Sequence, residues 1–227
     1  MQESHLKSLL TKLTSESEDV VDLSGLVIES SQLSAIFAVI DQREGLTKMV
    51  FNHCQLDDAS IALIADFLEQ KPAIVTVHLN FNNMTDDGAS HIARILRDNA
   101  SLEELFIAGN HLSHDGIVGI AQSLAQNQTL KTLNIGWNLD RNPESIALIF
   151  AEENIAQNTT IESIKLGLGP GRKEMEPITK GLKEVAEVTS RNIALCYLNP
   201  EKQEKRPQTS PQVRRDEKEK VAQQHYL

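Results

Sequence analysis

The residues of this chain best suited to chemistry are its seven histidines and two cysteines. His53 and His78 fall at outward-facing positions of neighbouring predicted strands, and adjacent strands lie about 4.8 Å apart. A zinc site would need at least a third ligand with suitable geometry, and the nearby Cys54 is predicted to face the interior. We therefore predict no metal site and interpret both histidines as surface residues.

Other chemistry-bearing motifs are also missing from the sequence. The stretch from Gly167 to Arg172 is rich in glycine, but it lacks the Gly-Lys-Ser/Thr ending of a phosphate-binding loop. No serine lies in a nucleophile-elbow motif, and both cysteines sit at core-type positions, which disfavours a nucleophilic thiol. We predict that the chain is not an enzyme and needs no cofactor.

The elements that position these residues follow a pattern that recurs every 28 residues. Apolar residues stand at the first, fourth and sixth places of each copy, and the first three copies also have an apolar residue at the eleventh place. Complete or partial copies begin at Leu46, Ile74, Leu102, Leu130 and Ile161, with 31 residues between the last two starts. The ninth place is filled by Cys54, Asn82, Asn110 and Asn138. We predict that these side chains satisfy backbone groups left unpaired where each strand ends.

Each copy predicts a short strand followed by a helix. The fourth and sixth places are two residues apart and so share one face of a strand. Apolar residues at helical spacing predict helices over residues 58–68, 88–96, 116–124 and 143–155. Polar residues near the helix starts are candidate caps: Asp57, Asp87, Asp115 and Asn142. Asn99, Asn127 and Asn158 precede the next strands, and we expect them to end helices in the left-handed conformation.

This pattern, L-x-x-L-x-L-x-x-N/C-x-L, resembles the leucine-rich repeats of the ribonuclease-inhibitor-like class over roughly residues 23–170. The resemblance implies an α/β solenoid shaped as a curved horseshoe, with parallel strands on its concave face and helices on its convex face. It implies about five full repeats plus atypical end repeats. We divide the chain into an N-terminal capping helix (1–22), the repeat domain (23–199) and a polar, charged tail (200–227) that is disordered or loosely helical.

The ends of the repeat domain depart from the pattern. Leu23, Leu26 and Ile28 suggest an atypical first repeat that starts only 23 residues before Leu46. The last strand fits two registers, one with Ile193, Cys196 and Leu198 and one with Leu195 and Leu198. In the fourth copy Asp140 replaces an apolar residue.

Composition excludes several classes of function. The net charge of −10 argues against nucleic-acid binding, and no apolar run reaches the roughly 18 residues of a membrane helix. The N-terminal residues lack an export signal. Two unpaired cysteines indicate a reducing compartment, so we expect a cytoplasmic monomer.

The outward-facing strand positions carry the functional hypothesis. Aromatic residues form only 4% of the chain, yet several are predicted to lie on the concave face or its edge, where aromatic anchors often dominate binding energy. The candidate partner-binding residues are His53, His78, Phe81, Glu104, Phe106, Asn134, Trp137 and Lys165. For Phe81 and Trp137 an alternative is packing over the turn between strand and helix.

We therefore expect a scaffold that binds a protein partner on its concave face. The short acidic chain with a Glu/Lys-rich tail also looks like the leucine-rich-repeat effectors that intracellular bacteria inject into host cells by type IV secretion. An alternative is regulation of a GTPase, because some such repeats resemble GTPase-activating proteins, although those carry a strongly acidic tail and this tail is mildly basic. A ligand-sensing repeat domain is a further alternative.

Overall fold

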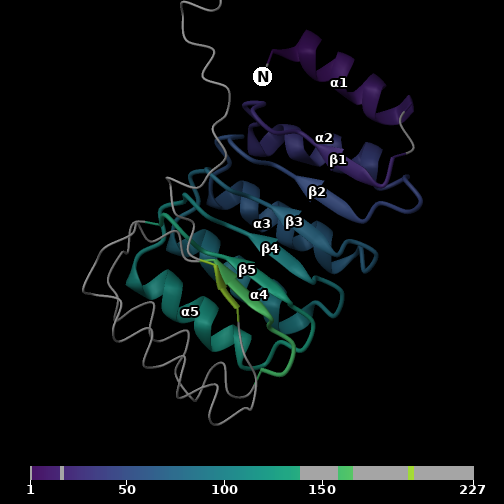
Figure 1. The fold of residues 1–227 in the computed structure, drawn as a ribbon. Coiled ribbons are helices and arrows are strands. Elements are labelled where there is room, and N and C mark those ends of the chain that lie inside the picture. The colour runs from purple at the N-terminus through teal and green to yellow at the C-terminus, as the bar shows by residue number, and fades with distance from the viewer. Residues whose placement is uncertain (1, 16–17, 139–157, 166–193, 197–227) are drawn as a thin grey trace, which may run out of the picture.

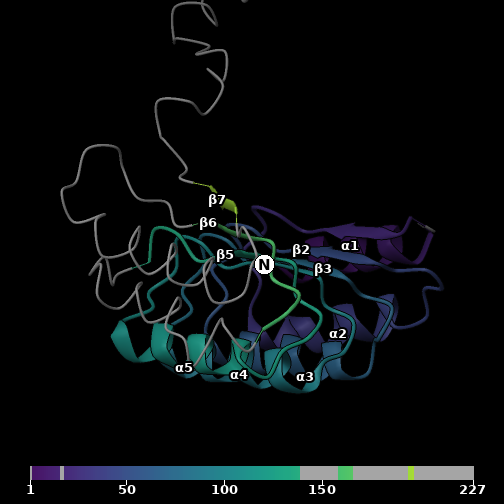
Figure 2. The same ribbon diagram turned by 60° about the horizontal axis from the view of Figure 1, so that its bottom comes forward.

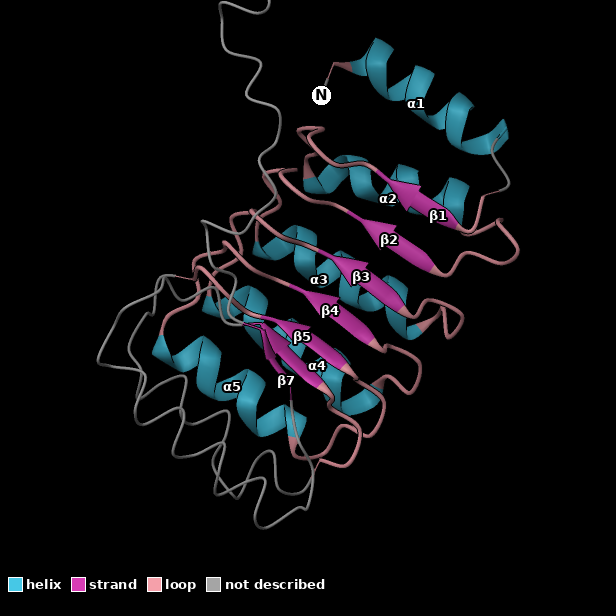
Figure 3. Cartoon of the chain, in the orientation of Figure 1, coloured by secondary structure: helices cyan, strands magenta, loops and turns pink. Residues whose placement is uncertain are grey.

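The computed structural model describes residues 2–15, 18–138, 158–165 and 194–196, the last of these as backbone only. Helices and strands alternate along the chain (Figures 1 and 3). Their bounds are α1 Glu3–Ser15, β1 Val20–Asp22, α2 Ser30–Ile40, β2 Lys48–Val50, α3 Asp58–Glu69, β3 Thr76–His78, α4 Asp86–Asp98, β4 Glu104–Phe106, α5 His114–Leu124, β5 Thr132–Asn134, β6 Ser163–Lys165 and β7 Ala194–Cys196. The helix predicted over residues 143–155 lies outside the described residues.

The strands form one parallel sheet in the order β1-β2-β3-β4-β5-β6-β7, so each repeat pairs only with its neighbours. Helices α2 to α5 form a second layer on one face of this sheet (Figure 2). The opposite face of the sheet carries none of the described helices. This arrangement confirms the predicted α/β solenoid with strands on one face and helices on the other.

The first repeat keeps the regular period. Val21 pairs with Met49, which takes the fourth place of the next repeat, so the two repeats are offset by 28 residues. The expectation of an atypical first repeat only 23 residues ahead of Leu46 is therefore wrong. The apolar spacing of Leu23, Leu26 and Ile28 misled it, because Leu23 takes the sixth place and packs inward beside Val21. The first strand also begins at Val20, inside the range assigned to the capping helix.

The core lies between the two layers. The side chains that the structure describes at the fourth and sixth places are buried there, among them Met49, Phe51, Val77, Leu105 and Ile107. Burial of each such side chain stabilises the fold by roughly 1.5–3 kcal/mol. Because no repeat can bury its own apolar face, this energy is gained only when neighbouring repeats stack.

The ninth-place residues form the predicted ladder. The Asn82 amide donates to the carbonyls of Phe51 and Leu79 at 2.8 and 3.0 Å, and its oxygen accepts from the amides of Cys54 and Leu56 at 2.9 and 3.1 Å. Asn110 and Asn138 repeat both carbonyl contacts in the next two repeats, and their oxygens accept from the amides of Met84 and Leu112 at 3.3 and 3.4 Å. Cys54 is fully buried, and its thiol donates to the Leu23 carbonyl at 3.1 Å, which confirms Cys54 as a ladder member.

A second asparagine row differs from the prediction. Asn99 has an extended backbone (φ −84, ψ 128) and Asn127 is not among the described residues with positive φ, so the left-handed helix ends expected at these two residues are wrong. The helix that Asn158 was expected to end lies outside the described residues. The side chains of this row instead join two repeats. The Asn127 amide donates to the Leu96 carbonyl at 2.7 Å, and its oxygen accepts from the Leu130 amide at 2.7 Å. This bonding needs only a suitably aimed side chain, so no left-handed backbone is required.

The helix caps come partly from the neighbouring repeat. Asp57 caps α3 as predicted, because its carboxylate accepts from the Ser60 amide. Asp87 and Asp115 do not cap α4 and α5, which begin after Thr85 and Ser113. Instead, the Asp58 carboxylate accepts from the amides of Thr85 and Gly88 at 2.7 and 2.9 Å. The predicted cap Asn142 lies outside the described residues.

Asp86 holds the start of α5 at the corresponding place, by accepting from the amide and hydroxyl of the N-cap residue Ser113. A Cβ atom at Gly88 or Gly116 would lie 2.4 or 2.3 Å from the capping carboxylate oxygen of Asp58 or Asp86. Glycine is thus required at both positions by the carboxylate of the preceding repeat.

The two ends of the sheet are built differently. Helix α1 lies beside β1 at the first end (Figure 1), where Leu6, Leu9, Leu10 and Leu13 pack against the core. At the other end Leu195 pairs with Ile164 and so takes the fourth place. Neither predicted register is therefore right, because one places Cys196 at the fourth place and the other, with Leu195 and Leu198 three residues apart, places Leu198 there. Asp140 and the tail, residues 200–227, lie outside the described residues.

Candidate interaction surface

The eight candidate residues divide into two sets. Five lie on the strands, on the sheet face away from the helices, and we call them the face patch: His78, Glu104, Phe106, Asn134 and Lys165. Three lie just after the strands, at the eighth place of their repeats: His53, Phe81 and Trp137. With Gly25 and Gly109, which hold the same place in β1's and β4's repeats, these three form what we call the rim row.

Phe106 is the centre of the face patch. The His78 ring lies 4.2 Å from the Phe106 ring, centroid to centroid, with 37° between the planes. Lys165 places its Nζ 4.8 Å from the Phe106 centroid, within the range of a cation–π interaction. Lys165 comes from β6 and reaches past Asn134 of β5, which is buried. The patch therefore joins β3, β4 and β6 into one surface.

The face patch is held in place but remains accessible. Phe106, Glu104 and Lys165 are half-buried, and the Thr76 hydroxyl donates to the Glu104 carboxylate at 3.2 Å. Burial lowers the pKa of His78 below its usual 6.5, and the charge of Lys48 lowers it further. The imidazole is therefore neutral at pH 7 and presents a flat, uncharged ring beside Phe106.

The rim row has an unusual backbone. His53, Phe81 and Trp137 have φ values of 57°, 57° and 52°, in the left-handed region where glycine is favoured. Gly25 and Gly109 adopt the same conformation, with φ of 79° and 68°. A bulky residue in this region costs on the order of 1–3 kcal/mol. Three large aromatic rings are thus carried at a place where glycine would be more stable.

The rim rings lie against one another along the edge of the sheet. The rings of His53 and Phe81 stack with centroids 4.6 Å apart and 5° between their planes. Phe81 and Trp137 follow with centroids 6.1 Å apart. A Cβ atom at Gly109 would lie 2.3 Å from Cδ1 of Phe81. The Phe81 ring therefore covers Gly109 and bridges the two repeats on either side of it.

This geometry answers part of the alternative left open by the sequence. Phe81 does pack over a neighbouring turn, yet 44% of it remains exposed, so packing and contact are compatible. The Phe81 ring fills the space beside Gly109. The sequence analysis did not predict the left-handed backbone of the rim row. The signal was present, because Gly25 and Gly109 share the eighth place of the repeat with aromatic residues.

No candidate metal site occurs among the described residues. They contain no group of three or more His, Cys, Asp or Glu arranged to hold a metal ion. Burial raises the pKa of the Cys54 thiol from 9.0 to about 11, which makes it a poor nucleophile. The described part of the chain also contains no helix of sufficient length and apolar character to cross a membrane.

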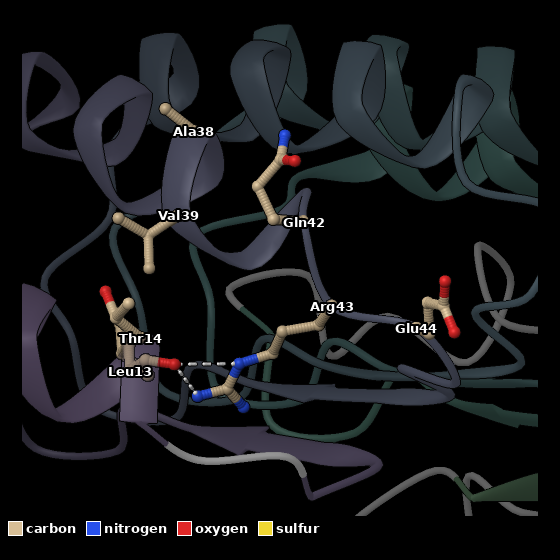
Figure 4. Close-up of a pocket in the computed structure, with 7 residues that line it drawn as sticks. All are labelled: Leu13, Thr14, Ala38, Val39, Gln42, Arg43 and Glu44. Atoms are coloured by element: carbon tan, nitrogen blue, oxygen red, sulfur yellow. Dashed lines mark hydrogen bonds between the residues drawn. The ribbon is translucent and has the colours of Figure 1, made fainter.

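A pocket of about 420 Å³ lies between α1 and α2 (Figure 4). It is lined by Leu13, Thr14, Ala38, Val39, Gln42, Arg43 and Glu44. The Arg43 guanidinium donates to the Leu13 carbonyl through Nε at 3.1 Å and Nη2 at 2.5 Å, and so fixes the end of α1 to the first repeat. The lining has neither a cysteine nor a histidine.

Comparisons with known proteins agree with the repeat architecture. The sequence model of the family described as Leucine Rich repeat matches residues 72–93 and 126–138. These two matches contain the start of the third and fifth repeats, including Asn82 and Asn138 of the ladder. No match is found among curated proteins.

Two solved structures are similar in fold. The tropomodulin C-terminal domain of Caenorhabditis elegans has a TM-score of 0.52 and 12% identity, and the match covers 63% of this chain and 88% of that domain. The fragment named Leiomodin-1 Actin-Binding Site 2 has a TM-score of 0.50 and 15% identity, with 98% of this chain and 96% of that fragment covered. At these identities the similarity concerns the fold alone.

Proposed function

We propose that this chain, which has the leucine-rich-repeat fold, is a non-catalytic scaffold that binds a protein partner through the face patch. The observation that carries the proposal is the arrangement around Phe106, which draws His78 and Lys165 from two other strands onto one aromatic ring. Aromatic residues supported in this way are common binding hot spots. A stacked repeat also offers a long, continuous surface to a partner.

Because of its position, Phe106 can be substituted to test partner binding without disturbing the core. Its neighbours Leu105 and Ile107 are buried in the core, whereas Phe106 projects from the opposite face and is half-buried. A change at Phe106 therefore removes surface contacts and leaves the core intact. The same cannot be done at Leu105, where truncation would open a cavity.

The test compares captured partners of the wild-type chain with those of Phe106→Ala. We expect a specific partner to be lost with Phe106→Ala and kept with Thr132→Ala, a half-buried outward position on the next strand. The melting temperatures of both variants should stay near that of the wild type. Equal capture by wild type and Phe106→Ala would refute the role of the face patch.

Actin is a partner that can be tested directly, since one structural neighbour is named as an actin-binding site. Co-sedimentation of the purified chain with filaments, and its effect on polymerisation, would show whether this chain shares the property. A single-turnover GTP hydrolysis assay with candidate GTPases tests the alternative of GTPase regulation.

We also propose that the chain acts as a bacterial effector on a host protein. This proposal rests on the charged tail of residues 200–227, which lies outside the described residues. A translocation assay that compares the full chain with a chain ending at Pro200 tests it. Equal translocation of the two would remove the argument for a secretion signal, and with it the expectation of delivery from a bacterial cytoplasm.

A further inference from the structure

The rim row ends in an empty place at the first repeat. The backbone runs in register along the row, because Gly25, His53, Phe81 and Gly109 each donate through their amide to the seventh-place carbonyl of the next repeat at 2.8–3.0 Å. Gly25 therefore takes the place next to His53, where another ring would continue the stack. A Cβ atom at Gly25 would meet nothing within 4 Å beyond its chain neighbours.

This place, which we call the Gly25 slot, has an apolar side. Leu26 and Val27, which follow Gly25, are 36% and 47% exposed, and with Phe81 they are the large hydrophobic residues most exposed among the described residues. His53 is also exposed. The slot therefore has the exposed His53 next to it along the rim row and two exposed aliphatic residues next to it along the chain.

The loops that carry the rim row are negatively charged. Residues 25–31, 53–59, 81–87 and 109–115 contain six carboxylates and neither Lys nor Arg: Glu29, Asp57, Asp58, Asp86, Asp87 and Asp115. Asp22, at the end of β1, is exposed beside the slot and accepts from the Ser24 amide. Hydrogen bonds from Ser60 lower the pKa of Asp57, so that carboxylate stays ionised.

The opposite edge of the sheet has a different charge pattern. The loops that precede the strands, residues 41–47, 69–75, 97–103 and 125–131, carry four cations and five carboxylates, a net charge of −1 against −6 for the rim loops: Arg43, Lys71, Arg97 and Lys131 with Asp41, Glu44, Glu69, Asp98 and Glu103. Some of these cations are already paired, as Lys71 is with Asp41 at 2.6 Å and Lys131 with Glu103 at 2.8 Å. A cationic partner segment is therefore favoured along the rim row and not along the opposite edge.

We propose that the Gly25 slot binds an arginine side chain of an extended basic segment in the partner protein. The guanidinium plane stacks on the outer face of His53 and continues the row of rings, as arginine does on aromatic faces. Its methylene groups cover Leu26 and Val27, and Asp22 and the rim carboxylates oppose its charge. This inference rests on the proposed binding function and assigns a chemistry to one part of the partner.

The experiment uses the full chain and a fluorescein-labelled peptide of four Gly-Arg repeats, with binding followed by fluorescence anisotropy. Matched peptides carry lysine or citrulline in place of arginine. We expect the citrulline peptide, which keeps the planar group and loses the charge, to bind at least tenfold more weakly. We expect the lysine peptide, which keeps the charge and loses the plane, to bind several-fold more weakly.

Two glycine variants test the slot itself. Gly25→Asn fills it with a residue that tolerates the left-handed backbone, and should weaken arginine-peptide binding about tenfold. Gly45→Asn is the matched control, because Gly45 has φ of 82° and equally open surroundings but lies on the opposite edge. Should Gly25→Asn fail to fold, His53→Ala removes the stacking wall at an exposed position and should give a similar loss.

Three results would overturn the inference: equal binding of the arginine and lysine peptides, equal effects of Gly25→Asn and Gly45→Asn, or no effect of His53→Ala. The face patch is tested separately. Phe106→Ala should leave peptide binding unchanged, so failure of the slot would not be confused with failure of the proposed scaffold function.

Discussion

Replacement of Gly109 by alanine should destabilise the folded chain in two ways, through a clash with the Phe81 ring and through a strained backbone. The new Cβ atom would lie 2.3 Å from Cδ1 and 2.6 Å from Cε1 of Phe81, so the ring must move. Alanine must also adopt φ near 68°, which costs about 1–2 kcal/mol for a residue with a Cβ atom. The first cost depends on Phe81, and the second does not.

The size of the ring cost follows from what Phe81 contacts. Moving the ring disturbs its stacking on His53 and its contact with Trp137, each worth roughly 0.5–1.5 kcal/mol. Because Phe81 is 44% exposed, we take the lower part of that range. Gly109→Ala should therefore cost about 2–3 kcal/mol in the wild-type chain and about 1–2 kcal/mol in a Phe81→Ala chain.

A double-mutant cycle in urea denaturation measures this difference, with an expected coupling of about 1 kcal/mol. Gly45→Ala serves as the control, since Gly45 has φ of 82° with nothing near its Cβ position. It should cost about 1–2 kcal/mol in both backgrounds. If Gly109→Ala costs the same with and without Phe81, the ring does not pack on Gly109 and the description of the rim row is wrong.

Three further predictions concern buried groups. Asn82→Ala should lower the free energy of unfolding by about 3–5 kcal/mol, because it leaves two amides and two carbonyls without their side-chain partner; a loss below about 1 kcal/mol in urea denaturation would contradict the ladder. In a Cys196→Ser chain, Cys54 should resist thiol labelling at pH 8 until the protein unfolds, since burial raises its pKa to about 11; rapid labelling of the folded chain would argue against this. His78 should titrate below 6.5 in NMR spectra because burial disfavours its charged form. The unfolded chain then gains the proton first as pH falls, so stability is full above about 6.5 and declines below it, and His78→Phe should flatten that decline.

Most of the fold could be predicted from the sequence because every repeat must bury and hydrogen-bond residues at the same places. Apolar residues at the fourth and sixth places must be buried, and a polar ninth-place residue such as Asn110 must satisfy strand ends, so the pattern alone located strands, core and ladder. It also placed Phe106 on the outer face, because successive strand residues face opposite sides and Leu105 faces the core. The first repeat was misplaced because its start, Glu18, is polar, and Leu23 imitates the beginning of a copy.

What the sequence by itself determined is therefore everything that repeats: the period, the inward face and the buried ladder. Tertiary structure decided which side chains of one repeat contact the next repeat. The carboxylate of Asp58 accepts from the amide of Thr85, 27 residues later at the start of α4, and the ring of Phe81 covers a glycine 28 residues away. Stacking brings these groups within contact distance, and it also lines up the left-handed turns that hold His53, Phe81 and Trp137 along one edge. Such contacts depend on the distance and orientation between stacked repeats, which the sequence pattern of a single repeat does not determine.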